Sequence, residues 1–89
     1  MLTLKSTYVL RKIGNDYFAV CVTASAASQQ MLKLNETGAF LFERCKEGID
    51  EHKLVAALLD EYEVSRELAE ADVARFILTL RQNGLTDEA

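Results

Sequence analysis

The chain has 89 residues, 49% of them hydrophobic, which is enough for one compact domain but not for two with separate cores. Ten Lys and Arg residues against fourteen Asp and Glu residues give a net charge of −4, so no overall positive field would draw the chain to nucleic-acid phosphates or to an anionic membrane. We expect one domain over residues 1–89, with its core at about residues 8–85 and little room for a deep catalytic cleft.

The amino-terminal third predicts a small antiparallel sheet. Residues 8–13 and 17–22 are two runs of β-branched and aromatic side chains, and the turn formers Gly14-Asn15-Asp16 between them indicate a hairpin. Residues 23–29 are small and polar without periodicity, which is typical of a loop. A weakly alternating run then predicts a third short strand at Met31, Leu32, Lys33 and Leu34.

The period of the apolar residues changes at Asn35, where a first helix is expected to begin. The Asn35 side chain can accept from the free amides of a first helical turn, and Gly48 supplies a plausible left-handed stop. Gly38 has two interpretations: it lets a neighbouring backbone approach closely, or it is simply a tolerated weak helix residue. The sequence therefore joins a β-rich third to a helical remainder at this point.

Two more helices complete the predicted order. Asp50 can cap a second helix, whose apolar residues recur at helical spacing up to Tyr62. Ser65 can cap a third helix, which ends at Asn83-Gly84. The predicted fold is α+β, a three-stranded antiparallel sheet followed by three helices in a winged-helix-like arrangement.

The third predicted helix has two apolar faces. One is a core stripe made of Ala69, Val73, Phe76, Ile77 and Leu80. The second comprises Ala71, Ala74 and Leu78. Two accounts of the second face stay open: it packs on the domain's own sheet, or it forms one wall of a groove beside an open third strand. Such an edge could recruit an extended peptide, with Lys33, Arg75 and Arg81 either contacting acidic peptide side chains or remaining solvated.

Six short motifs follow one another between Leu34 and Leu85, within a resemblance that covers most of the chain, from about Tyr8 to Leu85. They are Leu34-Asn35-Glu36-Thr37-Gly38, Glu47-Gly48, the helix that Asp50 starts, Glu61-Tyr62-Glu63-Val64, Asp72-Val73-x-x-Phe76-Ile77 and Gly84-Leu85. No single motif is specific, but their order and spacing together resemble the PqqD-like family. That resemblance implies a non-catalytic peptide chaperone without a cofactor, which binds the leader segment of a ribosomal precursor peptide.

In that family the leader adds to the third strand, against the third helix, and is presented to a modifying enzyme that is often a radical S-adenosylmethionine (SAM) enzyme. The resemblance thus implies a pairing edge at Met31, Leu32, Lys33 and Leu34, while the helix wheel suggests Ala71, Ala74, Arg75 and Leu78 for the groove side. Members that serve pyrroloquinoline quinone synthesis more often have Asp-Gly after the first helix and an aromatic residue after the terminal Gly. Glu47-Gly48 and Gly84-Leu85 depart from this pattern, so we expect a different peptide-modification pathway.

Other classes of function fit less well. Catalysis or metal binding would need a tuned acid, base or ligand set, whereas the chain has one histidine, His52, and two distant cysteines, Cys21 and Cys45, which we expect to be buried thiols. A winged-helix DNA-binding regulator is the main alternative, although the third helix begins with acidic residues that would face phosphates. The chain has no signal-peptide core or membrane-length apolar run, so we expect a cytosolic protein, with a homodimer through the open edge also possible.

Overall fold

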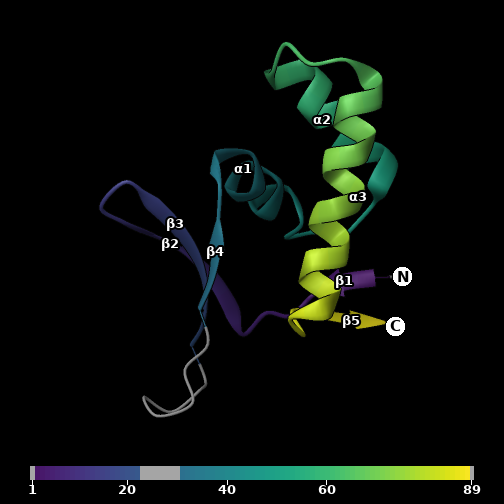
Figure 1. The fold of residues 1–89 in the computed structure, drawn as a ribbon. Helices are drawn as coiled ribbons and strands as arrows, with labels where there is room; N and C mark the ends of the chain where they lie inside the picture. The colour runs from purple at the N-terminus through teal and green to yellow at the C-terminus, as the bar shows by residue number, and fades with distance from the viewer. Residues whose placement is uncertain (1, 23–30, 89) are drawn as a thin grey trace.

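The computed structural model describes residues 2–22 and 31–88 and contains five strands and three helices over those ranges. In chain order these are β1 (Leu2–Leu4), β2 (Tyr8–Ile13), β3 (Asp16–Cys21), β4 (Met31–Leu34), α1 (Glu36–Arg44), α2 (Glu51–Glu61), α3 (Arg66–Gln82) and β5 (Thr86–Glu88). The predicted α+β class, a three-stranded antiparallel sheet followed by three helices, is confirmed (Figure 1).

The three-stranded sheet has the order β2-β3-β4, with both neighbouring pairs antiparallel. Gly14 lies at the turn between β2 and β3 with a φ of 64°, a left-handed conformation that suits the twist of a tight hairpin. The predicted hairpin and the predicted third strand are therefore both present. The loop predicted at residues 23–29 lies outside the described residues.

All three helices begin at the predicted capping residues. The side chains of Asn35, Asp50 and Ser65 each accept a hydrogen bond from a backbone amide of the first turn that follows. The predicted stop of the first helix at Gly48 is wrong, because α1 already ends at Arg44. The Cys45 amide donates to the Phe42 carbonyl at 3.1 Å, which tightens the last turn before the chain reaches Gly48.

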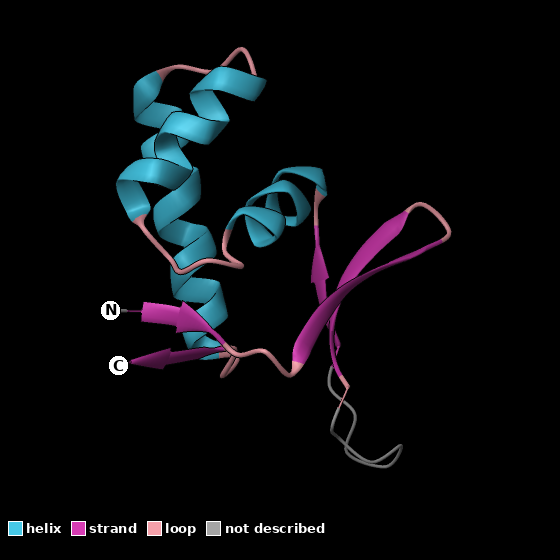
Figure 2. Ribbon diagram, turned by 180° about the vertical axis from the view of Figure 1, so that it is seen from behind, coloured by secondary structure: helices cyan, strands magenta, loops and turns pink. Residues whose placement is uncertain are grey.

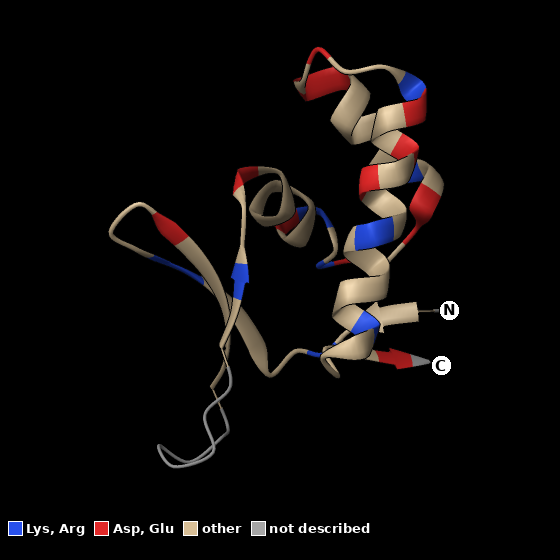
Figure 3. Cartoon of the chain, in the orientation of Figure 1, with Lys and Arg blue, Asp and Glu red and all other residues tan. Residues whose placement is uncertain are grey.

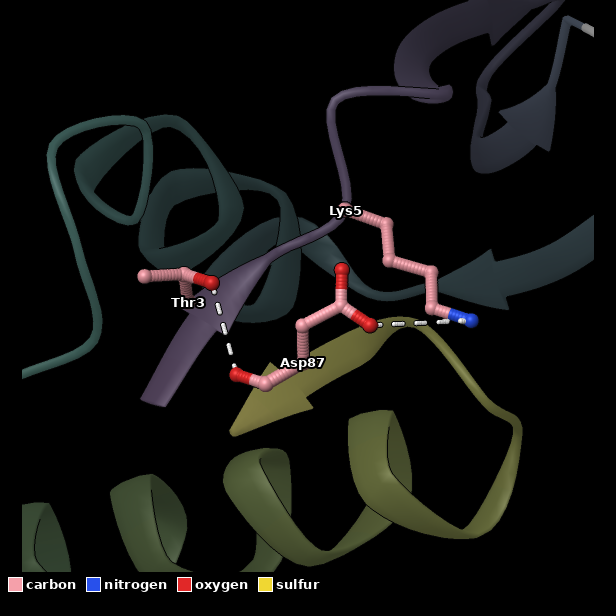
Figure 4. Close-up of polar contacts among 3 residues, drawn as sticks. All are labelled: Thr3, Lys5 and Asp87. Carbon is pink, nitrogen blue, oxygen red and sulfur yellow. Dashed lines mark hydrogen bonds and ion pairs between the residues drawn. The ribbon is translucent and has the colours of Figure 1, made fainter. Parts of the chain in front are cut away.

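A second, two-stranded sheet was not expected from the sequence. β1 and β5 pair antiparallel, so the two ends of the described chain lie side by side (Figure 2). Figure 4 shows the Thr3 hydroxyl donating to the Asp87 carbonyl at 3.3 Å and the Lys5 ammonium 4.0 Å from the Asp87 carboxylate. Strands of three residues are too short to show an alternating pattern, so the sequence carries no signal for them.

One hydrophobic cluster joins the sheet to the helices. α2 lies along α3, and α1 lies between that pair and the sheet (Figures 1 and 2). The core stripe predicted on α3 is confirmed, since four of its members are buried: Ala69, Val73, Phe76 and Leu80. Ala19 and Leu34 bring the inner face of the sheet into the same cluster, which fixes β4 relative to α1.

Candidate functional site

A groove of about 200 Å³ runs between β4 and α3, and α1 contributes to its lining. Lys33 and Leu34 line it from β4, Leu41 lines it from α1, and Arg75 and Phe76 line it from α3. In Figure 1, β4 is the strand of the three-stranded sheet nearest to α3. The groove thus lies along a sheet edge.

The hydrogen-bond pattern of the sheet shows which groups of β4 face outward. The Val22 amide donates to the Thr7 carbonyl at 2.8 Å. Every second residue of β3 before Val22 therefore directs its backbone amide and carbonyl toward β2. The residues between them direct their backbone amides and carbonyls toward β4, where they lie opposite Leu32 and Leu34. The backbone groups of Leu32 and Leu34 are consequently used inside the sheet.

Met31 and Lys33 occupy the alternate positions of β4, so their amides and carbonyls point away from β3. No other described strand pairs with that side of β4, because the sheet order ends there. The predicted open edge is therefore present within the described residues. Its two outward-facing residues offer two donors and two acceptors to another extended chain.

The side chains of β4 alternate between two environments. Leu32 packs against the core cluster and Leu34 belongs to it. Met31 is 49% exposed, and the Lys33 side chain extends toward solvent, with its ammonium 3.7 Å from the Asp16 carboxylate. A strand paired with β4 would place its own side chains alternately on the same two faces.

The α3 wall of the groove is formed by residues at helical spacing: Asp72, Arg75, Phe76 and Thr79. Of the four α3 residues predicted for the groove side, only Arg75 lines it. Ala74 and Leu78 line a different hollow, together with Leu2 of β1 and Ile49 of the segment between α1 and α2. All three apolar residues of the second face, Ala71 included, are exposed, so the account that packs this face on the domain's own sheet is wrong.

Sequence reasoning missed Asp72, Phe76 and Thr79 as groove residues for a physical reason. The groove face of α3 is mixed in polarity and shares Phe76 with the core stripe, so an apolar periodicity cannot separate it from solvent-facing positions. The spacing of three and four residues around Arg75 was the available signal.

The junction between β4 and α1 shapes one end of the groove. The Gly38 amide donates to the Asn35 side-chain oxygen at 2.7 Å, and both residues line the groove. A Cβ atom added at Gly38 would lie 3.1 Å from that oxygen and 3.4 Å from the Leu34 Cβ. The close approach at Gly38 therefore involves the side chains of Leu34 and Asn35 and not a neighbouring backbone.

The titratable groups outside the groove do not assemble a reactive centre within the described ranges. Burial raises the pKa of Cys45 to about 12, which keeps this thiol protonated, and His52 is exposed on α2. Burial, and then the nearby carboxylates of Glu36 and Glu61, raise the pKa of Tyr62. In residues 2–22 and 31–88 we find no cluster of side chains that could hold a metal ion, and no helix long and apolar enough to cross a bilayer.

Comparison with known proteins identifies the family of the chain that forms this groove. Residues 21–85 match the model of the family described as coenzyme PQQ synthesis protein D, PqqD. The chain belongs to the PqqD family. The match includes all of β4, α1, α2 and α3, and therefore both walls of the groove. A comparison with curated proteins finds no match.

Two solved structures share the fold of this PqqD family member. The structure of TbiB1 in complex with the TbiA(beta) leader peptide is 20% identical, with a TM-score of 0.76 over 98% of this chain and 96% of that chain. The structure of a lasso peptide synthetase B1 complexed with its leader peptide is 24% identical, with a TM-score of 0.75 over 98% of each chain. The similarity covers 98% of the chain, whereas the family match begins after β1 and ends before β5.

Proposed function

We propose that this protein is a non-catalytic carrier that binds the leader segment of a ribosomally made precursor peptide. The observation that carries the proposal is the edge of β4 with which no other described strand pairs, beside a groove whose far wall is α3. A leader segment would add to β4 as a further strand through the outward groups of Met31 and Lys33. Both solved structures of the same fold contain leader peptides, which supports this assignment.

The proposal extends to what happens after binding. The bound peptide is presented to a modifying enzyme in the cytosol, and the family resemblance favours a radical SAM enzyme as that partner. On the protein side, β4 and Arg75 contribute to the site, and Leu41 and Phe76 form its apolar part. A homodimer through β4 would compete with peptide binding because it would use the same edge.

The direct test uses as its probe the short precursor peptide that we expect to be encoded beside this gene. Titration into the isotopically labelled protein should shift the amide resonances of Met31 and Lys33 and those of the groove face of α3. Lys33→Pro removes an outward amide without removing a hydrogen bond inside the sheet, so we expect a folded protein with peptide affinity reduced about tenfold or more.

Leu32→Pro is the matched comparison on the same strand. Because the Leu32 amide points toward β3, this substitution should break the β3–β4 ladder and lower stability as well as binding. Circular dichroism and thermal unfolding separate the two effects. Full peptide affinity in a folded Lys33→Pro protein would refute strand addition at β4.

A further inference from the structure

Two basic residues line the groove from opposite walls. Lys33 comes from β4 and Arg75 from the middle of α3, and both contribute to the same cavity. In Figure 3 the basic position on β4 lies at a similar height to a basic band in the middle of α3. A chain lying along β4 would therefore pass between these two basic residues.

The Arg75 guanidinium is available to a ligand. It forms no hydrogen bond or ion pair with any other described residue, whereas the Arg75 carbonyl accepts from the Thr79 hydroxyl at 2.9 Å. That bond involves only the backbone of Arg75. The five N–H groups of its side chain therefore have no partner among the described residues. A carboxylate is the partner whose geometry matches a guanidinium in two parallel hydrogen bonds.

Lys33 is only weakly engaged by the protein itself. Its ammonium lies 3.7 Å from the Asp16 carboxylate, and the two side chains are 67% and 52% exposed. Exposed pairs of this kind contribute roughly 0–1 kcal/mol, so a ligand carboxylate can compete for Lys33 at little cost.

The charge balance of the groove is opposite in sign to that of the chain. Lys33 and Arg75 outnumber Asp72, the one acidic residue among those that line the groove, whereas the chain as a whole carries a net charge of −4. Long-range attraction therefore does not favour an acidic peptide, and any preference must come from contacts inside the groove. The Thr37 hydroxyl also lines the groove and forms no hydrogen bond with another described residue, so it can serve a second carboxylate oxygen.

We propose that the groove selects leader segments that carry an Asp or Glu side chain between Lys33 and Arg75, with Arg75 as the specificity-determining residue. This inference rests on the proposed function, because it names the class of peptide that the β4 edge accepts. Backbone pairing at β4 accepts any extended chain, whereas the carboxylate contact restricts which chains bind well and in which register.

The test begins with a displayed library of random 12-residue peptides selected against the folded protein. We expect the enriched peptides to share one acidic position within an otherwise strand-forming segment. Synthetic copies of one selected peptide with Glu, Gln or Lys at that position should rank in that order, with Gln about five- to tenfold weaker than Glu at low salt. The difference should shrink as ionic strength rises.

Arg75→Glu should reverse the ranking so that the Lys peptide binds better than the Glu peptide. Arg66→Glu is the matched control, because Arg66 is exposed at the start of α3, outside the groove, and undergoes the same charge change. It should preserve the wild-type ranking.

The outcomes distinguish this inference from the proposed function on which it rests. Peptides that shift the β4 amides without an acidic position, or a ranking that Arg75→Glu leaves unchanged, would overturn the inference and leave the proposed function standing. Failure of every library peptide and of the neighbouring gene's peptide to bind would overturn both.

Discussion

Single residues at the helix starts allow the positions of the three helices to be predicted from the sequence. Asn35, Asp50 and Ser65 were all predicted as caps, and each side chain accepts an amide hydrogen bond in the structure. These contacts involve residues two or three apart, so a local reading of the sequence is sufficient to find them. Contacts between distant residues, such as the Ile49 amide with the Leu2 carbonyl, leave no comparable local signal.

Asp50 offers a test of one cap at a site remote from the groove. Its carboxylate accepts from the amides of His52 at 3.0 Å and Lys53 at 3.2 Å. Asp50→Ala should lower the free energy of unfolding by about 1 kcal/mol, because two amides lose their partner. Urea unfolding measures the loss. Asp50→Asn should retain most of the stability, and both variants should bind peptide like the wild type.

Cys45 gives the stability of the protein a specific alkaline dependence. Its pKa in the folded state is about 12, raised by burial from an ordinary value of 9.0. Above pH 9 the unfolded state loses the thiol proton while the folded state keeps it, so the free energy of unfolding falls as pH rises toward 12. The slope due to this group is at most about 1.4 kcal/mol per pH unit.

The measurement is urea unfolding at pH 8, 9 and 10 for the wild type and for Cys45→Ala. The variant should be less stable at pH 8, because it leaves a small cavity, but should lose less stability as pH rises. Equal pH dependence in the two proteins would contradict a buried, protonated Cys45.

At the scale of elements, α3 shows which of its faces an apolar sequence pattern can predict. Periodicity predicted its buried stripe correctly because burial in the core depends on apolar side chains. It did not find the groove face, since Asp72 and Thr79 resemble solvent-facing residues until β4 is placed opposite them. The strand that borders the groove was predictable from sequence, whereas on α3 only Arg75 was identified among the residues that line it, because only tertiary packing decides which side of α3 meets the sheet edge.

Two positions on α3 allow the core and the outer face to be compared directly. Leu80 is completely buried, whereas Leu78 is 53% exposed and lines the hollow away from the groove. Leu80→Ala should lower the free energy of unfolding by about 2–5 kcal/mol through lost burial and a cavity. Leu78→Glu should change stability by less than about 1 kcal/mol and leave peptide affinity unchanged.

Thermal unfolding and peptide titration of the two variants provide the readouts. A large loss of peptide affinity in a folded Leu78→Glu protein would show that the groove extends around α3 farther than its described lining.

At the scale of the whole molecule, the sheet and the helices share one core. Buried residues of β3, β4 and all three helices form a single cluster that includes Leu85, directly before β5, and Leu2 and Leu4 of β1 pack against it. The overall α+β order was predictable because it depends on strong local patterns. The pairing of the two chain ends was not, since it joins segments more than 80 residues apart.

This shared core leads us to expect one cooperative unfolding transition. Tyr8 and Tyr17 report on the sheet and Tyr62 on the end of α2, while far-UV circular dichroism reports mainly on the helices. Urea unfolding followed by tyrosine fluorescence and by circular dichroism should give the same midpoint. Separate midpoints would show that the sheet unfolds independently of α2 and α3.

Under the proposed function, the shortness of β4 limits how long a peptide stays bound. The outward groups of Met31 and Lys33 allow about four backbone hydrogen bonds, worth roughly 2–6 kcal/mol together, whereas micromolar affinity requires about 8 kcal/mol. Side chains in the groove must supply the remainder. With ordinary association rates, a micromolar complex has a residence time of roughly 0.1–10 s, so under the proposed function one copy of the protein would deliver many precursors in succession.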